Sequence, residues 1–235
     1  MTKDRPTKAH AQLRALHAEE IACRRCPRLV EYREQVARDK RRAFRDWEYW
    51  GRPLPGFGDP DARLMIIGLA PAAHGGNRTG RVFTGDRSGD WLYETLHRFG
   101  FANQPISAHR NDGLRLTDAY VNAAVRCAPP DNKPTPAESE SCRPYLEREL
   151  ALLPRLRVIV PLGRFALDAY LAARRAIAQP VPQPRPAFAH ARVHLLSNVS
   201  VVCSYHPSQR NTQTGMLTHA MFDHVFAIAR QLLEH

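Results

Sequence analysis

The sequence predicts an α/β fold, a three-layer α/β/α sandwich with a central four-stranded parallel sheet. Four short apolar runs recur along the chain, at 64–69, 119–125, 158–162 and 199–205. Their apolar residues are continuous rather than alternating, which is typical of strands buried on both faces of a parallel sheet. Helical patterns separate the runs, and such alternation of strand and helix favours a sheet covered by helices on both faces.

The residues before the first strand predict two helices and a loop. A pattern of good helix formers covers 7–22, and a very polar helix is expected from about 29 to 44. A short cysteine-containing segment interrupts them, and the turn-rich stretch at 51–61 predicts a loop. We therefore expect a single domain over residues 1–235, with residues 1–60 as a helical extension that carries the first two cysteines.

Start and stop signals predict the later helices. Leu92 and Leu96 lie on one face of a helix that stops at Gly100. Thr135 to Glu138 reads as a capping box, and the helix after it is expected to break or kink at Pro144. Two further helices are expected, one over residues 163–175 and one marked by the stripe of Met221, Val225, Ile228 and Leu232. The Pro-rich stretch 176–192 predicts a surface loop.

Composition narrows the class of partner. Lysine and arginine number 34 against 23 aspartates and glutamates, which gives a net charge of +11. This balance favours an anionic partner, most often nucleic acid, although an ordinary basic protein is an equal alternative. No apolar run is long enough to span a bilayer, and the polar start of the chain has no apolar signal segment. We therefore expect a cytoplasmic protein.

Four of the five cysteines suggest a metal centre. Cys23 and Cys26 have C-x2-C spacing, and fourteen residues separate Cys127 from Cys142. Four thiolates suit a tetrahedral zinc ion or an iron–sulfur cluster. The wide second pair is unlike a zinc ribbon and favours the cluster. Four unrelated buried thiols are the third interpretation, and Cys203 is expected to belong to the core.

Three polar stretches follow predicted strands, where open parallel sheets bind their ligands. They are the loop GLAPAAHGGNRTGRVFTGD at 68–86, the segment 122–127, and the segment 205–208. The loop has glycines at P-loop separation, but Arg81-Val82 stands where a P-loop has Lys followed by Ser or Thr. We therefore expect the strand ends to form a ligand site that is not a P-loop.

These stretches carry a resemblance to a known family. Residues 68–72 with 80–86, residues 122–130 and residues 205–209 resemble motifs of the uracil-DNA glycosylase superfamily, specifically its family 5, the type-5 enzymes. The resemblance implies a monomeric DNA repair enzyme. It would flip uracil, and other deaminated bases, out of DNA and hydrolyse the N-glycosidic bond to leave an abasic site. It also implies a [4Fe–4S] cluster held by Cys23, Cys26, Cys127 and Cys142.

The same resemblance implies roles for the pocket residues. Phe83 would stack on the flipped base, Asn122 would read its edge, and His206 would hydrogen-bond a uracil oxygen. The backbone around the base would come from Gly68, Ala70 and Ala72, with a DNA contact from Ser208.

Water activation is where the sequence departs from most of the superfamily. Most families place Asp, Asn or Glu in the first motif, and this chain has Leu69 and Ala70 there, as family 5 does. Asn77, helped by backbone carbonyls, is our candidate for orienting the water. Asp86 is a weaker candidate, and we expect it to cap the helix that begins near Ser88. The alternative overall is a non-catalytic, metal-containing nucleic-acid-binding protein. A family-4 enzyme is less well supported, because of Leu69-Ala70 and the long loop that follows.

Overall fold

The computed structural model describes residues 8–234, and its sheet has six strands in the order β1-β3-β2-β4-β6-β5. The four predicted strands form its middle and pair in parallel. In the register, Ile66 pairs with Val121 on one side and with Val160 on the other. The bounds of these strands are Leu64–Gly68 for β2, Ala119–Ala123 for β3, Val158–Pro161 for β4 and Ser200–Val202 for β6.

The sheet is mixed, which corrects the expectation of four parallel strands. Two short edge strands, β1 (Phe57–Gly58) and β5 (Val193–Leu195), pair antiparallel with β3 and β6. Neither contains a continuous apolar run, and Val193 and Leu195 are exposed. Strands this short, with no buried face of their own, leave no hydrophobic pattern in the sequence.

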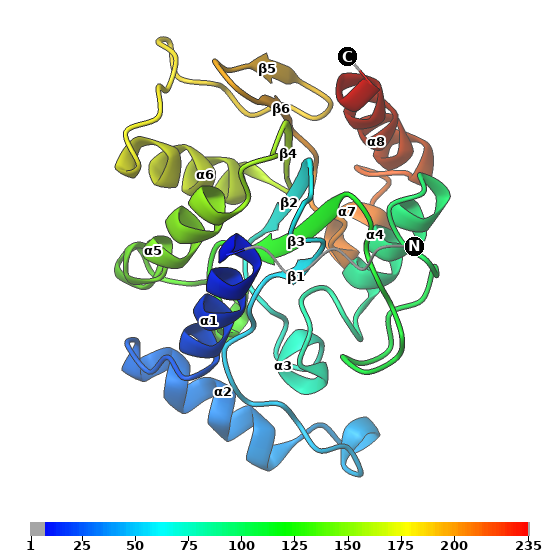
Figure 1. Ribbon diagram of the computed structural model, residues 1–235. Helices are drawn as coiled ribbons and strands as arrows, with labels where there is room; N and C mark the ends of the chain where they lie inside the picture. The colour runs from blue at the N-terminus through cyan, green and yellow to red at the C-terminus, as the bar shows by residue number, and fades with distance from the viewer. Residues whose placement is uncertain (1–7, 235) are drawn as a thin grey trace, which may run out of the picture.

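Helices cover both faces of the sheet (Figure 1). On one face lie α1 (Lys8–Ile21), α5 (Pro136–Leu152) and α6 (Arg164–Ala176), packed against alternate strand residues such as Met65 and Ile67. On the other lie α4 (Arg87–Arg98) and α8 (His219–Glu234), packed against Leu64 and Ile66. The three-layer α/β/α arrangement is therefore confirmed.

Helix boundaries follow local chemistry. The predicted capping box is present at α5, where Thr135 accepts from the Glu138 backbone N–H and Glu138 accepts from that of Thr135. Contrary to expectation, α5 runs unbroken through Pro144. The second helix of the extension, α2 (Pro27–Asp39), ends earlier than predicted because Lys40 takes a left-handed φ of 52°. A 3-10 turn, η1 (Arg42–Phe44), follows it.

Three short helical turns follow strand ends and shape the loops there. They are α3 (Gly76–Thr79) after β2, η2 (Pro130–Asn132) after β3 and α7 (Gln209–Gln213) after β6. None of the helices within residues 8–234 combines the length and apolarity that crossing a bilayer requires.

Candidate active site

Phe83 and His206 meet beyond the carboxyl ends of two different strands. Phe83 lies in the loop after β2, and His206 follows β6. Their ring centroids are 5.8 Å apart, with 30° between the ring planes. Both side chains are half-buried. The structure thus brings together two of the residues that the sequence singled out, from segments more than a hundred positions apart.

Gly68, the last residue of β2, makes room for the Phe83 ring. A Cβ at position 68 would lie 2.5 Å from Cζ of Phe83. The Phe83 backbone has a φ of +50°, in the left-handed region that bulky residues rarely occupy. Strain of this kind persists only where neighbouring contacts enforce it, and it concentrates at functional sites.

The contacts that hold Phe83 act on the residues beside it. The hydroxyl of Tyr93 in α4 donates to the carbonyl of Val82 at 2.9 Å. Nε of Arg81 donates to Oγ1 of Thr84 at 3.1 Å. These bonds fix the backbone on both sides of Phe83 and set the direction of its ring.

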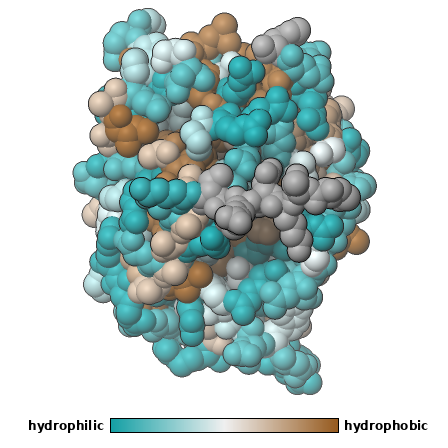
Figure 2. Space-filling view, in the orientation of Figure 1, coloured by the Kyte–Doolittle hydropathy of each residue, from teal (hydrophilic) through white to brown (hydrophobic). Residues whose placement is uncertain are grey.

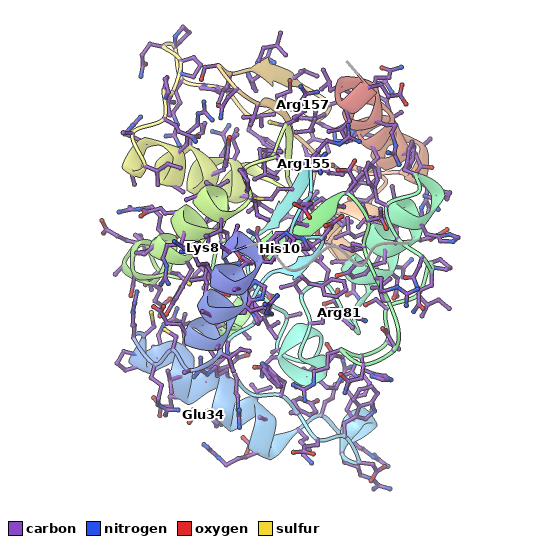
Figure 3. The ribbon with its side chains drawn as sticks, in the orientation of Figure 1. Lys8, His10, Glu34, Arg81, Arg155 and Arg157 are labelled. Carbon is purple, nitrogen blue, oxygen red and sulfur yellow. The ribbon has the colours of Figure 1, made fainter. Side chains whose placement is uncertain are left out.

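Arg81 is a buried anchor that the sequence analysis used only to argue against a P-loop. Its Nη2 donates to Oγ of Ser107 and the carbonyl of His109, both at 2.8 Å, and lies 2.5 Å from Oδ2 of Asp112. The arginine lowers the pKa of Asp112 below its usual range and keeps it ionised. Figure 3 shows Arg81 beside α3, within the loop that carries Phe83.

His206 is held as a neutral imidazole. Burial lowers its pKa to about 4. Its carbonyl accepts from the Ser208 backbone N–H at 2.8 Å and from Nδ2 of Asn211 at 2.9 Å, which fixes the turn. Ser208 caps α7, since its hydroxyl accepts from the Asn211 N–H. Within the part of the chain that the structure describes, no hydrogen bond occupies the ring nitrogens of His206, so they are free for a ligand.

Asp86 caps a helix, as expected. Its carboxylate accepts from the Gly89 N–H at 3.0 Å at the start of α4, and burial raises its pKa.

The loop between Gly68 and Phe83 supplies mainly backbone groups. Ala70 and Ala72 are half-buried, and the carbonyl of Ala72 accepts from the N–H groups of Gly75 and Asn77. Asn77 is 1% exposed, and its Nδ2 donates to the carbonyl of Arg33 in α2 at 3.1 Å. Its Oδ1 is buried and has no hydrogen-bond partner among residues 8–234. The role of Asn77 with water stays a prediction.

The structure does not bring Asn122 to Phe83 and His206, and this corrects the expected placement. Asn122 lies on the same face of β3 as Tyr120, opposite the face on which a Gly68 side chain would meet Phe83. Its Nδ2 donates to Oε2 of Glu149 in α5 at 2.6 Å, and it is fully buried. Alternation along the strand explains this, since neighbouring residues point to opposite faces.

Asn122 instead belongs to a buried polar network that the sequence analysis missed. Glu149 accepts from Asn122, from the Tyr120 hydroxyl at 2.8 Å and from Arg126. Arg126 also lies 3.5 Å from Glu20 of α1, and both carboxylates are fully buried. The network connects α1 and α5 beneath the strand that leads to the site. Asn122 within the apolar strand β3 was its one visible trace in the sequence, because Glu20 and Glu149 lie on helices that carry many other charged residues.

The four predicted cysteines surround one small cavity. Cys23 and Cys26 lie between α1 and α2, Cys127 follows β3, and Cys142 lies in α5. Nη1 of Arg33 donates to Sγ of Cys127 at 2.9 Å, and the Arg126 N–H donates to Sγ of Cys142 at 3.3 Å. Burial raises the pKa of the Cys127 thiol to about 11 and that of the Cys142 thiol to about 12.

The cysteine sulfurs are more widely spaced than a zinc site requires. Within residues 8–234, ligand atoms of three His, Cys, Asp or Glu residues lie within 4.8 Å of one another at His17, Glu20 and Glu149, and not at the cysteines. Zn–S bonds of about 2.3 Å place the sulfurs of a tetrahedral site roughly 3.8 Å apart.

Comparison with known proteins agrees with this geometry. Residues 55–230 match the model of the uracil DNA glycosylase superfamily. The chain belongs to this superfamily. It is 54% identical over 212 residues to the type-5 uracil-DNA glycosylase of Mycobacterium bovis, covering 89% of this chain and 78% of that protein. It is 52% identical over 214 residues to the type-5 enzyme of Thermus thermophilus, covering 90% and 94%.

Within the superfamily, the chain is of the type-5 group. The type-4 uracil-DNA glycosylase of Thermotoga maritima is 30% identical over 154 residues, covering 65% of this chain and 68% of that protein. The type-5 identities are higher and cover more of the chain. The resemblance read from the sequence motifs is confirmed.

Proposed function

We propose that the chain is a monofunctional uracil-DNA glycosylase that hydrolyses the N-glycosidic bond of uracil in DNA and leaves an abasic site. The observation that carries the proposal is the pairing of Phe83 with a neutral His206 at the strand ends, in a type-5 member of the superfamily. A base inside a duplex is out of reach, so the target nucleotide is flipped into the pocket.

The two rings have complementary tasks. Phe83 offers an aromatic face on which the flipped base stacks. When the bond between N1 and the sugar breaks, the electron pair moves into the base and negative charge develops on its oxygens. A neutral imidazole still carries one N–H group, and this group can donate a hydrogen bond to the developing negative charge. Such a preorganised donor contributes about 3 kcal/mol to stabilising the transition state.

The sugar left behind is an electrophile to which water adds, and the proton that the water loses neutralises the departing uracil anion. Neither Ala70 nor Ala72 offers a side-chain base, and the Asp86 carboxylate is engaged as a helix cap. Asn77 is our candidate for orienting the water. Its buried Oδ1 has no hydrogen-bond partner among residues 8–234, and such groups commonly bind water. Asn122 has no part in this scheme, because its Nδ2 is bonded to Glu149 on the face of β3 opposite Phe83.

We further propose that the four cysteines hold a [4Fe–4S] cluster. The wide spacing of the four sulfurs supports this assignment over zinc. The cluster would stabilise the fold by joining the extension to β3 and α5. Iron and acid-labile sulfide in the purified protein would support the assignment. Stoichiometric zinc, in the absence of iron and sulfide, would contradict it.

The function is tested with labelled duplexes that carry one uracil opposite G or A, treated with alkali after incubation. Strand cleavage at the uracil that requires alkali supports a monofunctional glycosylase. Binding of the duplex without any base release contradicts the proposal and supports a non-catalytic nucleic-acid-binding protein. An undamaged duplex is the control.

A further inference from the structure

Two adjoining hollows lie along residues 48–52, between α2 and α3. The first, an open groove of about 610 Å³, lies between α2 and residues 49–52. The second, of about 260 Å³, lies between residues 48–52 and α3. Both are lined by Tyr49, Trp50 and Arg52. We call them together the arginine trough.

The lining of the trough is strongly basic. Two glutamates, Glu34 and Glu48, are opposed by six arginines, which are Arg24, Arg33, Arg38, Arg52, Arg78 and Arg110. Charge of this kind attracts a polyanion. Figure 2 shows a largely hydrophilic surface over the lower end of the molecule, where Figure 1 places α2 and α3.

Three of these arginines already have hydrogen-bond partners within the protein. Arg24 pairs with Glu34 at 2.5 Å, and Arg33 donates to Cys127. Arg78 donates to the carbonyls of His74 and Gly85. They are structural, and a ligand would have to compete for them.

The other three have free guanidinium groups. Arg38, Arg52 and Arg110 are exposed, and within residues 8–234 their guanidinium groups form no hydrogen bond or salt bridge, although Arg38 is close enough to Glu34 to help lower the pKa of that carboxylate. Two of them are nevertheless ordered. The guanidinium carbon of Arg110 lies 4.3 Å from the ring centroid of Trp50, and that of Arg52 lies 5.6 Å from it. Stacking on an aromatic ring orients a guanidinium group and leaves its N–H edge free for an anion.

Backbone hydrogen bonds connect the trough to the pocket loop. The N–H of Trp50 donates to the carbonyl of Arg78 at 3.1 Å, and that of Gly51 donates to the carbonyl of Asn77 at 3.0 Å. The Tyr49 hydroxyl bonds Nδ1 of His74 at 3.1 Å. The trough therefore continues from the same loop that carries Phe83.

We propose that the arginine trough binds the phosphate backbone of the DNA flanking the flipped nucleotide, on one side of the lesion, through Arg38, Arg52 and Arg110. The proposal rests on the function proposed above, since that function identifies the polyanion as DNA. It makes the N-terminal extension part of the DNA-binding surface in addition to its role in carrying two of the cysteines.

The test measures binding, so it does not depend on base release. The probe is a 30-base-pair duplex with a tetrahydrofuran abasic-site analogue at its centre, and its affinity is followed by fluorescence anisotropy from 50 to 200 mM KCl. For the Arg52→Ala/Arg110→Ala variant we expect roughly tenfold weaker binding and a salt slope shallower by about 1.8, because each lost phosphate contact contributes about 0.9. Arg52→Lys/Arg110→Lys should retain most of the affinity, since lysine also binds phosphate as a point charge.

The matched control is Arg155→Ala/Arg157→Ala. Both residues are exposed and lie at the opposite end of the molecule from Glu34 (Figure 3). The control removes the same charge, and its slope should stay that of the wild type. If the control variant loses as much DNA affinity as the trough variant, the proposal is overturned, because the loss would then reflect only the change in net charge. An unchanged slope in the trough variant, with an unchanged melting temperature, overturns it too.

The one-sided geometry gives a second criterion. With the analogue three base pairs from one end or from the other, the trough variant should differ from wild type on only one of the two duplexes. A difference of equal size on both contradicts the proposal. If the wild-type protein binds these duplexes with the expected slopes yet releases no uracil, the proposed function fails while the trough assignment stands.

Discussion

Phe83 is the residue whose position depends most on its neighbours. Its φ of +50° is unfavourable, and its ring lies where any side chain at position 68 would be. Tyr93 and Arg81 hold the backbone on either side of it. The ring can therefore stack on a base without first being ordered by the substrate, which lowers the entropic cost of binding.

Gly68→Ala should displace the Phe83 ring. The added Cβ would lie 2.5 Å from Cζ of Phe83, so either the ring or the loop must move. We expect uracil release to fall by about tenfold to a hundredfold, as for other misplacements of about 1 Å near reacting groups. Single-turnover rates measure it, with Ala151→Ser, at an exposed position near the end of α5, as the control. A wild-type rate for Gly68→Ala would show that the ring position does not matter.

His206 should make stability depend on pH. Its folded pKa of about 4 lies below the ordinary value of 6.5, so the unfolded chain binds the proton more readily between these values. Stability from the neutral ring is present above pH 6.5 and is lost as the pH falls toward 4, by at most about 1.4 kcal/mol per pH unit. Urea unfolding at pH 7 and pH 5 should show a smaller decrease for His206→Gln than for wild type. Equal decreases would mean that His206 titrates normally.

At the scale of elements, a buried polar network joins α1 and α5 beneath β3. Arg126 lies between Glu149 and Glu20, and Glu149 also accepts from Tyr120 and Asn122. Breaking such a network leaves an uncompensated buried charge.

Glu149→Ala should therefore lower the free energy of unfolding by about 3–5 kcal/mol, because Arg126 would remain buried without its main partner. Asp168→Ala, which breaks the half-exposed pair with Arg185, is the control and should cost less than about 1 kcal/mol. Chemical denaturation measures both. A similar small loss in the two variants would show that the buried network is not a major source of stability.

The sequence predicted elements with strong periodicity and missed those without it. The four central strands and the capped helix α5 carry continuous apolar runs or a capping box, and all are present. The edge strands β1 and β5 have no buried run, so nothing marked them. The segments that carry Phe83 and His206 were singled out because they follow strands, where parallel sheets place ligands, and the family resemblance then pointed to these two residues within them.

Asn122 shows the limit of the same approach. Position along a strand places a residue at the site's edge, but the face to which it points depends on a period of two and on the exact register. Its neighbour Ala123 lies on the Phe83 face, one residue further on. The partners of Arg81 and Arg126 depend on contacts between distant segments, which a single sequence does not contain.

At the scale of the whole molecule, the pocket, the cysteine cavity and the arginine trough are connected. Arg33 in α2 donates to Cys127 and to the carbonyl of Cys23, and its own carbonyl accepts from Asn77 of the pocket loop. The extension is thus fastened both to the cysteine cavity and to the loop that carries Phe83.

Loss of the proposed cluster should therefore affect the loop that carries Phe83 as well as the extension. Cys26→Ser is expected to lose iron and sulfide, to lower the melting temperature, and to weaken DNA binding because the extension is no longer fixed. Cys203→Ser, at a buried core cysteine away from the cavity, is the control for iron content. Iron content and melting temperature, measured on the same preparations, test this prediction. Full retention of iron by Cys26→Ser would show that Cys26 is not a ligand of the cluster.

The most direct test of the account is the single-turnover rate of uracil release by wild type and His206→Ala, with DNA binding saturated in both. The account predicts a rate about 10²–10³-fold lower for the variant, because one preorganised donor to the leaving base is lost, with DNA affinity unchanged. A variant that releases uracil at the wild-type rate would contradict the central claim that the neutral His206 ring stabilises the departing base.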